Sequence, residues 1–362
     1  MNITVAHVDF HRILELVARV STKHLTLPVL QCVYLEVKDA VLTIRGTNLE
    51  IGIEGSLPVK QTVEGVVCVP ASTLLQTISL ISQSDITLKT EGDMLIVETK
   101  SSKSSINTVA NEEFPSIPKL TKEGQVIQGK AFSYGIKTAA FAASQSSIKP
   151  ELGSVYVFQK KEQTLTFVAT DSFRLVEKTV SQQQVILENG ILIPYKNALE
   201  MARVCELFEE NPTLFINDNQ CALQFGSVYI TSRLTTGTFP DYEGIIPKEF
   251  VTHVTLLTVD VQNALKKTNI FLNKFMKLGM GVSKNKLTLS SEGDEGTTKE
   301  DVTASVDGDD IALNFNQRYV QEILPYITDE SVSIHFAGIG RPIVVESVHD
   351  RSLRYLVMPM NK

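Results

Sequence analysis

The sequence has no tryptophan, and aromatic residues fill only 7% of its 362 positions. So few rings exclude a surface densely lined for stacking single-stranded bases. No stretch approaches the ~18 consecutive apolar residues of a membrane span. The first residues, Met1 to Val5, also lack the basic and then apolar pattern of a secretory signal. Together these absences predict a cytoplasmic protein.

Cysteine and histidine are scarce as well. His7 and His11 stand one helical turn apart, a spacing that suits zinc, but no third ligand is recognisable. An ordinary surface helix is therefore favoured over a metal site. Cysteines without a CxxC pair predict buried thiols in a reducing compartment. The four cysteines are Cys32, Cys68, Cys205 and Cys221.

The common catalytic motifs are also missing. There is no GxxxxGKS or GxxxxGKT loop for a nucleotide, no GxGxxG after a strand, no HExxH and no GxSxG. The most tempting carboxylate is Asp171, but it has no recognisable acid, base or metal partner, so a turn at the end of a strand is favoured. We expect no enzymatic activity, no cofactor and no metal. The alternative is a metal-dependent enzyme that acts on nucleic acid through Asp171.

What the sequence does contain is an internal repeat. A length of 362 residues with 43% apolar residues predicts two to four well-packed domains. In the first copy, alternating strands run over Val33–Val37 and Val41–Ile44. The same pattern returns after 123 and then 122 residues, at Val155–Phe158 with Thr164–Phe167 and at Gly279–Val282 with Lys286–Leu289.

Three copies of one domain therefore account for the chain, with predicted domains at 1–120, 127–246 and 247–362. Each copy predicts an α+β domain built as a doubled β-α-β-β-β unit, which gives six helices and about two dozen strands. The acidic, glycine-rich segment 292–301 predicts a mobile hairpin loop. The predicted helix windows are 7–23, 70–82, 129–143, 194–209, 260–277 and 316–324.

Charge is distributed unevenly between the predicted elements. The net charge of −7 argues against a protein that binds DNA over its whole surface. The six helix windows, however, hold 12 basic and 7 acidic residues, a surplus of five positive charges against −12 elsewhere. This indicates one surface that faces a polyanion. The alternatives are an ordinary mixed surface or a β-rich scaffold unrelated to DNA, and the surplus disfavours the scaffold.

Five segments in order carry a resemblance to a known family: Leu25–Leu30, Gly46–Glu50, Ala169–Leu175, Phe239–Tyr242 and Val357–Met360. With the repeat, they resemble the β subunits of bacterial DNA polymerase III, the sliding clamps, over essentially the whole chain. The resemblance implies a ring-shaped head-to-tail homodimer of clamp-type domains, with helices inside and sheets outside, that encircles double-stranded DNA. It also implies a non-catalytic, nucleoid-associated processivity factor that tethers the replicative polymerase and contacts phosphates without reading sequence.

The resemblance further implies a groove that receives short Gln- and Leu- or Phe-containing peptides from the polymerase, the clamp loader and repair proteins. Methionines suit such a groove, because Met358 and Met360 can repack around different ligands. The pair Ser172-Phe173 departs from the pattern of many clamps. Groove residues by resemblance are Leu152, Thr170, Phe173, Arg174, Leu175, Pro240, Ile245, Asn316, Tyr319, Val344, Leu356, Met358, Pro359 and Met360.

Two more sets follow from the resemblance. The dimer interface is expected at Ser104 and Ile106 of one copy and at Ile270, Phe271 and Lys274 of the other, through paired sheet edges. The residues expected to face DNA are Arg12, Arg19, Lys23, His24, Lys130, Lys137, Lys196, Arg203, Lys266 and Lys267.

Overall fold

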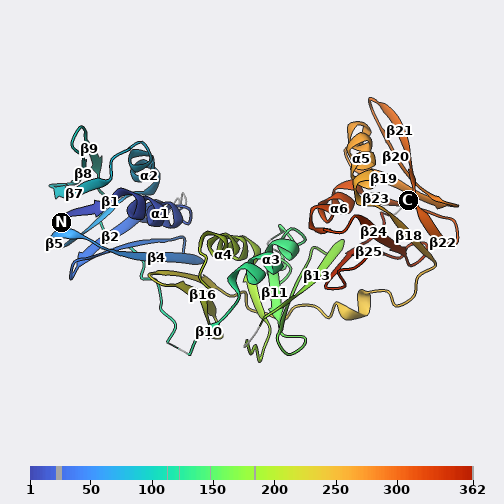
Figure 1. Cartoon of the computed structure of the whole chain (residues 1–362), viewed down its shortest axis with the longest axis horizontal. Helices are drawn as coiled ribbons and strands as arrows, with labels where there is room; N and C mark the ends of the chain where they lie inside the picture. Colours follow the sequence, from blue (N-terminus) through green and yellow to red (C-terminus); the bar gives the residue numbers. More distant parts are fainter. Residues whose placement is uncertain (22–26, 112, 122, 147, 183–184, 361–362) are drawn as a thin grey trace. The chain divides into compact units, whose positions relative to one another are not determined.

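The computed structural model describes residues 1–21, 27–111, 113–121, 123–146, 148–182 and 185–360 (Figure 1). Lys23 and His24 lie outside the described residues. The first repeat comprises β1 (Asn2–Ala6), α1 (His7–Ala18), η1 (Pro28–Gln31), β2 (Cys32–Lys38), β3 (Val41–Thr47), β4 (Ile51–Pro58), β5 (Lys60–Val63), β6 (Gly65–Pro70), α2 (Ala71–Ser79), β7 (Asp85–Glu91), β8 (Met94–Glu98) and β9 (Lys103–Asn107).

The second repeat is an undecorated doubled β-α-β-β-β unit. It comprises β10 (Gln125–Val126), α3 (Gly129–Ala140), β11 (Ser154–Phe158), β12 (Thr164–Thr170), β13 (Arg174–Ser181), β14 (Ile191–Pro194), α4 (Tyr195–Leu207), β15 (Thr213–Ile216), β16 (Gln220–Phe225) and β17 (Val228–Arg233).

The third repeat adds 3-10 turns to the same order, and an extra strand, β22, much as β5 is extra in the first repeat. It comprises η2 (Glu243–Ile245), β18 (Thr252–Leu257), α5 (Thr258–Thr268), η3 (Asn269–Phe271), β19 (Lys277–Ser283), β20 (Lys286–Gly293), β21 (Gly296–Thr303), β22 (Ser305–Gly308), β23 (Ile311–Asn316), α6 (Gln317–Glu322), η4 (Leu324–Tyr326), β24 (Ser331–Phe336), β25 (Ile343–Ser347) and β26 (Leu353–Val357). The three-copy α+β architecture is thus confirmed.

Two antiparallel sheets continue from one repeat into the next. In the eight-stranded sheet, of order β10-β15-β16-β17-β4-β3-β2-β6, β4 of the first repeat pairs with β17 of the second. In the nine-stranded sheet, of order β14-β11-β12-β13-β26-β25-β24-β18-β22, β13 of the second repeat pairs with β26 of the third. The two remaining sheets are β5-β1-β7-β8-β9 and β21-β20-β19-β23.

The described chain divides into two compact units, residues 1–130 with 200–234 and residues 131–199 with 235–362. The division falls inside the second repeat because the two halves of that repeat belong to two different continuous sheets. Each unit therefore contains one continuous sheet that joins two repeats, together with one smaller terminal sheet.

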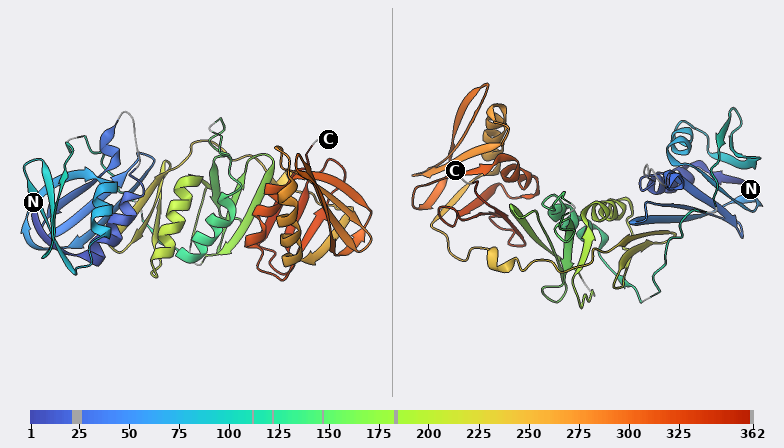
Figure 2. Two further views of the ribbon diagram at one scale, coloured as in Figure 1. Left: turned by 90° about the horizontal axis from the view of Figure 1, so that it is seen from above. Right: turned by 180° about the vertical axis from the view of Figure 1, so that it is seen from behind.

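Helices lie in pairs on the strands. Figure 2 shows α1 beside α2 and α5 beside α6, in agreement with the contacts between these elements. One apolar face of α1 is buried, since Phe10, Leu14 and Val17 are fully enclosed. The four cysteines are free and buried, as predicted. Burial raises the pKa of the Cys221 thiol to about 12, which keeps it protonated and unreactive.

The helices are shorter than the predicted windows. α5 ends at Thr268, so Lys274 lies in a loop and Lys277 begins a strand. The helices as the structure bounds them carry eight basic and six acidic side chains, so their positive surplus falls from five to two. The net charge of the helices is still positive, as predicted, but most of the predicted surplus belongs to residues that flank the helices.

The hairpin predicted over 292–301 is present, but most of the segment is strand rather than loop. In this hairpin, Glu292 pairs with Thr297 and Gly293 with Gly296. Gly296 has a φ of +141°, a conformation that glycine adopts without strain at this tight turn. The threonines that follow favour a strand, and the acidic residues Glu300 and Asp301 lie within β21.

The close approach of α1 to β4 generates a stability prediction. A Cβ atom on Gly55 would lie 2.4 Å from Cγ2 of Ile13, closer than packed carbons tolerate. Gly55→Ala should force α1 away from the sheet and lower the free energy of unfolding by about 1–3 kcal/mol, measured by urea denaturation. The matched control is Gly281→Ala in β19, where the nearest atom would lie 3.9 Å away and little change is expected. Equal effects of the two changes would contradict the close-packing explanation.

Candidate functional site

The turn between β12 and β13 is held by its own side chains. Thr170 Oγ1 donates to the carbonyl of Arg174 at 2.6 Å and accepts from the N–H of Ser172 at 3.1 Å. Asp171 Oδ1 accepts from the N–H groups of Phe173 and Arg174 at 3.0 and 3.1 Å. Ser172 has a φ of +77°, and Phe173 is 59% exposed. The turn thus presents one aromatic ring to solvent on a rigid backbone.

Arg174 lies beneath this turn and is buried. Its Nε is 3.1 Å from a carboxylate oxygen of Asp171, one terminal nitrogen pairs with Glu322, and the other donates to the Phe141 carbonyl at 2.7 Å. The guanidinium also lies 4.5 Å from the centre of the Tyr319 ring. Burial alone would lower the pKa of Arg174, but the surrounding acidic groups raise it above its usual value. The site therefore contains a permanently charged, fully engaged cation.

These contacts confirm the turn interpretation of Asp171. One of its carboxylate oxygens accepts from two backbone N–H groups and the other pairs with Arg174. Within the described ranges, no three His, Cys, Asp or Glu side chains are placed to hold a metal ion. The geometry gives Asp171 a structural role, so it does not support an enzyme that would use this residue to bind metal.

The chain that follows β26 runs beside the turn. The Met358 N–H donates to the Phe173 carbonyl at 2.8 Å, and the Met360 N–H donates to the Asn314 carbonyl at 2.7 Å. Both methionine side chains and Pro359 between them are half-buried. Because backbone hydrogen bonds hold this segment, flexible side chains are presented from a defined position.

An apolar cluster lies beneath the turn that presents Phe173 and joins the second and third repeats. Its buried members include Leu175, Val344 and Leu356, with Met358 packed against them. Tyr242 donates to the Glu177 carboxylate at 2.5 Å, and burial with this carboxylate raises the pKa of Tyr242 well above its usual range, which keeps the donor proton in place. The complete buried cluster is Val168, Leu175, Leu192, Phe239, Tyr242, Val344 and Leu356.

The predicted groove residues fall into two groups. The residues of the first group are buried and support the exposed residues of the second group. They are Leu152, Thr170, Arg174, Leu175, Val344 and Leu356.

The residues that reach solvent form what we call the Phe173 surface. Ile245 of η2 is 51% exposed, and the rings of Phe173 and Tyr319 stack with centres 6.5 Å apart. Asn316 caps α6, where its side chain accepts from the Arg318 N–H at 3.0 Å. The Phe173 surface comprises Phe173, Pro240, Ile245, Asn316, Tyr319, Met358, Pro359 and Met360.

Sequence reasoning missed several residues that shape this surface. Phe141 and Glu322 hold Arg174, and Asn314 holds the last described residues. Glu322 lies one helical turn after Arg318 on α6, with which it also pairs at 2.6 Å. That spacing predicts only an ordinary surface pair, and nothing local shows that a residue 148 positions away completes the cluster.

The described residues that are predicted to face DNA lie on or beside the helices, and most are exposed. Several already have partners: Glu200 pairs with Arg19 at 3.1 Å and with Arg203, and Arg12 lies 4.5 Å from the centre of the Phe208 ring. Of the residues predicted to face DNA, those that lie within helices and are exposed are Arg12, Lys130, Lys137, Lys196, Lys266 and Lys267.

The predicted interface residues lie on the edge strand β9 and in η3 with the loop that follows it. Ser104 is on the edge strand β9, but Ile106 is only 5% exposed and points into the core of its own sheet. In η3, Ile270 is 64% exposed. Lys274 lies 5.1 Å from the centre of the Phe275 ring, whose 62% exposure the sequence did not single out. Of the predicted interface residues, only Ile270 is therefore an exposed apolar residue.

Three family models match consecutive parts of this chain. They describe the N-terminal, central and C-terminal domains of the DNA polymerase III beta subunit, and match residues 1–118, 126–241 and 243–361. The beta sliding clamp of Haemophilus influenzae is 24% identical over 99% of this chain and 100% of its own length. That of Staphylococcus aureus is 26% identical over 92% of each chain.

Solved structures agree with these matches. The DNA polymerase III subunit beta of Pseudomonas aeruginosa aligns with a TM-score of 0.93 and 25% identity over the full length of both chains. A sliding clamp from the same organism, bound to griselimycin, aligns with a TM-score of 0.92 and 25% identity over both full lengths. Repeats, sheets and site together define a clamp of three like domains. The chain belongs to the DNA polymerase III beta subunit family, the beta sliding clamps, and its function is that of a sliding clamp. No helix in the described part of the chain is long and apolar enough to cross a membrane.

Arg174 and Arg318 provide a matched pair for testing the site, because both contact Glu322. Arg174→Ala removes a buried cation and leaves the half-buried carboxylates of Asp171 and Glu322 without it, so it should lower the free energy of unfolding by about 3–5 kcal/mol. Arg318 is 55% exposed, so Arg318→Ala should cost less than about 1 kcal/mol. Guanidinium chloride unfolding measures both. Comparable losses would show that burial does not determine the importance of Arg174.

Proposed function

We propose that two copies of this chain, each with domains at 1–120, 127–246 and 247–362, close head to tail into a ring around duplex DNA. The ring is non-catalytic, works at DNA in the cytoplasm, and tethers the replicative polymerase for processive synthesis. The observation that carries this proposal is the sheet arrangement, in which two continuous sheets are complete and two terminal sheets look like the halves of a third.

The strand orders match half by half. In the complete sheets, the four strands of a first half, β6-β2-β3-β4 or β14-β11-β12-β13, are followed by the strands of the next repeat, from β17 to β10 or from β26 to β18. In the third repeat, the four strands β23-β19-β20-β21 form a sheet in which no strand of another repeat follows β21. In the first repeat, the strands β9-β8-β7-β1 form a sheet in which no strand of another repeat precedes β9. By the same rule, β21 of one copy pairs with β9 of a second copy.

Edge pairing of this kind is heterologous, and such contacts close into a ring when the rotation permits. Free edge strands offer unpaired N–H and C=O groups to a partner. Phe271 lies against Gly296 at the start of β21, which places the exposed Ile270 in the same neighbourhood. An apolar contact beside the paired edges would add burial to the backbone hydrogen bonds.

Contacts with DNA would be made by cations on the helices. The surplus of two positive charges is modest, and surface pairs such as Arg19 with Glu200 are weak enough to yield to a phosphate. Weak, sequence-independent contacts suit a ring that must slide. Retention then depends on ring closure, since the salt-dependent attraction to phosphates is small.

Partner proteins would bind the Phe173 surface through short segments that contain glutamine and leucine or phenylalanine. Phe173 and Tyr319 offer stacked aromatic faces, and Met358 and Met360 offer adaptable apolar contacts. The buried Arg174 cluster would hold these side chains in place rather than contact the peptide. The replicative polymerase, the clamp loader and repair proteins are the proposed partners.

The dimer predicts a result for Ile270→Asp. A charge at this exposed position should leave the folded chain intact but weaken dimerisation by about tenfold or more, because it would be buried at the interface. Sedimentation velocity measures the dimer constant, and negative-stain electron microscopy should show closed six-lobed rings of wild-type protein. Ile339→Asp, at a position 84% exposed in the loop between β24 and β25, is the control and should not change the dimer constant. Compact wild-type particles without a hole would overturn the ring.

Removal of Met358 to Lys362 separates partner binding from ring formation. The truncation deletes the segment that donates to Phe173 and Asn314, so it should abolish stimulation of the polymerase by the loaded clamp. Dimerisation should remain, because β21 and β9 are untouched. The measurements are primer extension with the cognate loader and polymerase, and sedimentation of the truncated chain. Loss of the dimer would remove the support for this assignment of the Phe173 surface.

A further inference from the structure

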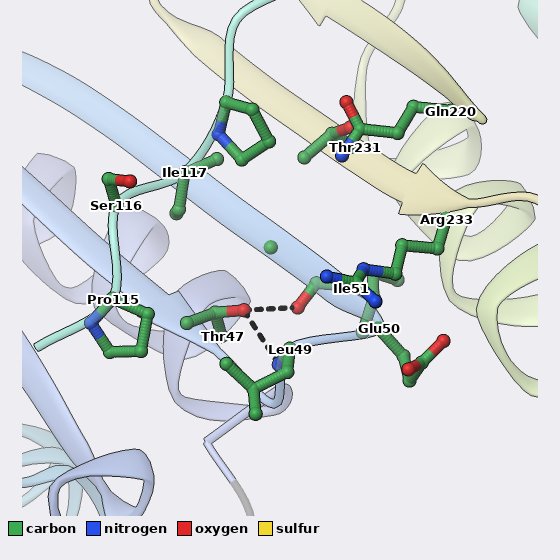
Figure 3. Close-up of a pocket in the computed structure, with 12 residues that line it drawn as sticks. Thr47, Leu49, Glu50, Ile51, Pro115, Ser116, Ile117, Gln220, Thr231 and Arg233 are labelled. Atoms are coloured by element: carbon green, nitrogen blue, oxygen red, sulfur yellow. Dashed lines mark hydrogen bonds between the residues drawn. The ribbon is translucent and has the colours of Figure 1, made fainter. Parts of the chain in front are cut away.

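A second candidate site lies in the first compact unit, at a cavity of about 360 Å³ (Figure 3). The end of β3, the start of β4, the segment 115–118 and residues of β16 and β17 line it. None of these residues belongs to the Phe173 surface, which lies in the other unit. The cavity is as large as the smaller ligand pockets of proteins.

The turn between β3 and β4, beside this cavity, repeats the hydrogen bonds of the turn that presents Phe173. Thr47 Oγ1 donates to the Ile51 carbonyl at 2.9 Å and accepts from the Leu49 N–H at 3.0 Å, as Figure 3 shows. Asn48 Oδ1 accepts from the N–H groups of Glu50 and Ile51 at 3.0 Å. Leu49 has a φ of +77°, the same value as the serine at the corresponding position of the other turn.

At each turn, a segment from another repeat runs alongside and forms the same backbone hydrogen bond to the turn. The Arg233 N–H donates to the Glu50 carbonyl at 2.8 Å, just as the Met358 N–H donates to the Phe173 carbonyl at 2.8 Å. The cavity therefore occupies the position in the first repeat that the Phe173 surface occupies in the second. Corresponding aromatic pairs flank the two sites, each with ring centres 5.0 Å apart: Tyr34 with Phe114, and Tyr156 with Phe239.

The backbone is shared, but the side chains differ in chemistry. The buried arginine is replaced by Ile51, the exposed phenylalanine by Glu50, and the methionine of the segment that runs alongside the turn by Arg233. Ile51 and Ile117 are only 4% and 9% exposed and contribute aliphatic surface to the lining. A cavity of this composition suits an aliphatic side chain rather than stacked rings.

Arg233 supplies the positive charge of the site, and the carboxylate of Glu50, which also lines the cavity, supplies a negative one. Arg233 is exposed, and among the described residues its guanidinium has no carboxylate partner. Figure 3 shows its side chain reaching from β17 toward the Ile51 side of the cavity. A guanidinium in this position can hold a carboxylate through two parallel hydrogen bonds.

We propose that this cavity binds an extended segment of another protein, with an aliphatic side chain against Ile51 and Ile117 and a neighbouring carboxylate on Arg233. This inference rests on the proposed function in one respect, because it takes the Phe173 surface to be a peptide-binding site. The two sites would then take different peptides, because one offers aromatic rings and methionines and the other offers aliphatic surface and a cation.

The test uses the full chain with labelled isoleucine and methionine methyl groups. The probe is the peptide acetyl-Gly-Leu-Asp-Gly-amide, and the matched peptide has asparagine in place of aspartate. The acidic peptide should shift the methyl signals of Ile51 and Ile117 in a saturable way, and the asparagine peptide should bind about tenfold more weakly, the loss of one charge-assisted contact. Arg233→Gln should remove this difference, whereas Arg318→Gln, which changes an exposed cation of the other unit, should keep it.

Each other outcome contradicts the proposal in a distinguishable way. Shifts confined to Met358 and Met360 would place the peptide on the Phe173 surface, and equal binding of both peptides would exclude the role of Arg233. An absence of shifts at Ile51 and Ile117 at millimolar peptide would exclude the cavity as a peptide site. Polymerase stimulation and its loss on truncation are measured separately, so they test the proposed function whatever this titration shows.

Discussion

The antiparallel pairing of β13 with β26 is the interaction on which the site depends. It joins strands of two different repeats, from Arg174 opposite Val357 to Lys178 opposite Leu353. Because this ladder is continuous, the residues just beyond β26 are delivered to the turn that presents Phe173. Neither strand could form the site within its own repeat. The same pairing makes the second repeat part of two sheets, which is why the compact units do not coincide with the repeats.

The second constraint is the buried charge of Arg174. A guanidinium withdrawn from water is tolerated only when its donors are satisfied, and three different segments supply the acceptors through Asp171, Glu322 and Phe141. These contacts fix the relative positions of the turn, α6 and the end of α3 within their unit. The aromatic rings above Arg174 are therefore held by a polar network rather than by apolar packing alone, so the surface can stay exposed and apolar without collapsing.

Much of this architecture is predictable from the sequence, because strand alternation and the 123-residue step are local and repeated patterns. The buried face of α1, with Phe10 and Val17, and the turn role of Asp171 follow from the same kind of reasoning. The roles of Glu322 and Phe141 do not, since their partner is far away in the chain and their own neighbourhoods look ordinary. The strand content of 292–301 was missed because acidic composition outweighed the threonines and glycines that shape its hairpin. Resemblance predicted a set of groove residues but could not separate its exposed from its buried members, because that distinction depends on the continuous sheets.

The two corresponding turns show how a repeated domain can acquire different sites. The hydrogen bonds from their side chains to the backbone differ in length by no more than 0.3 Å, and the residue with positive φ is a leucine in one turn and a serine in the other. The side-chain hydroxyl of the threonine and the oxygen of the Asx residue therefore determine the turn, and the remaining positions are free to change. In the second repeat that freedom places a cation below the surface and a phenylalanine above it, while in the first it places an isoleucine below and a glutamate above. Backbone geometry is thus inherited from the repeat, whereas recognition is set by the few side chains that the geometry leaves unconstrained.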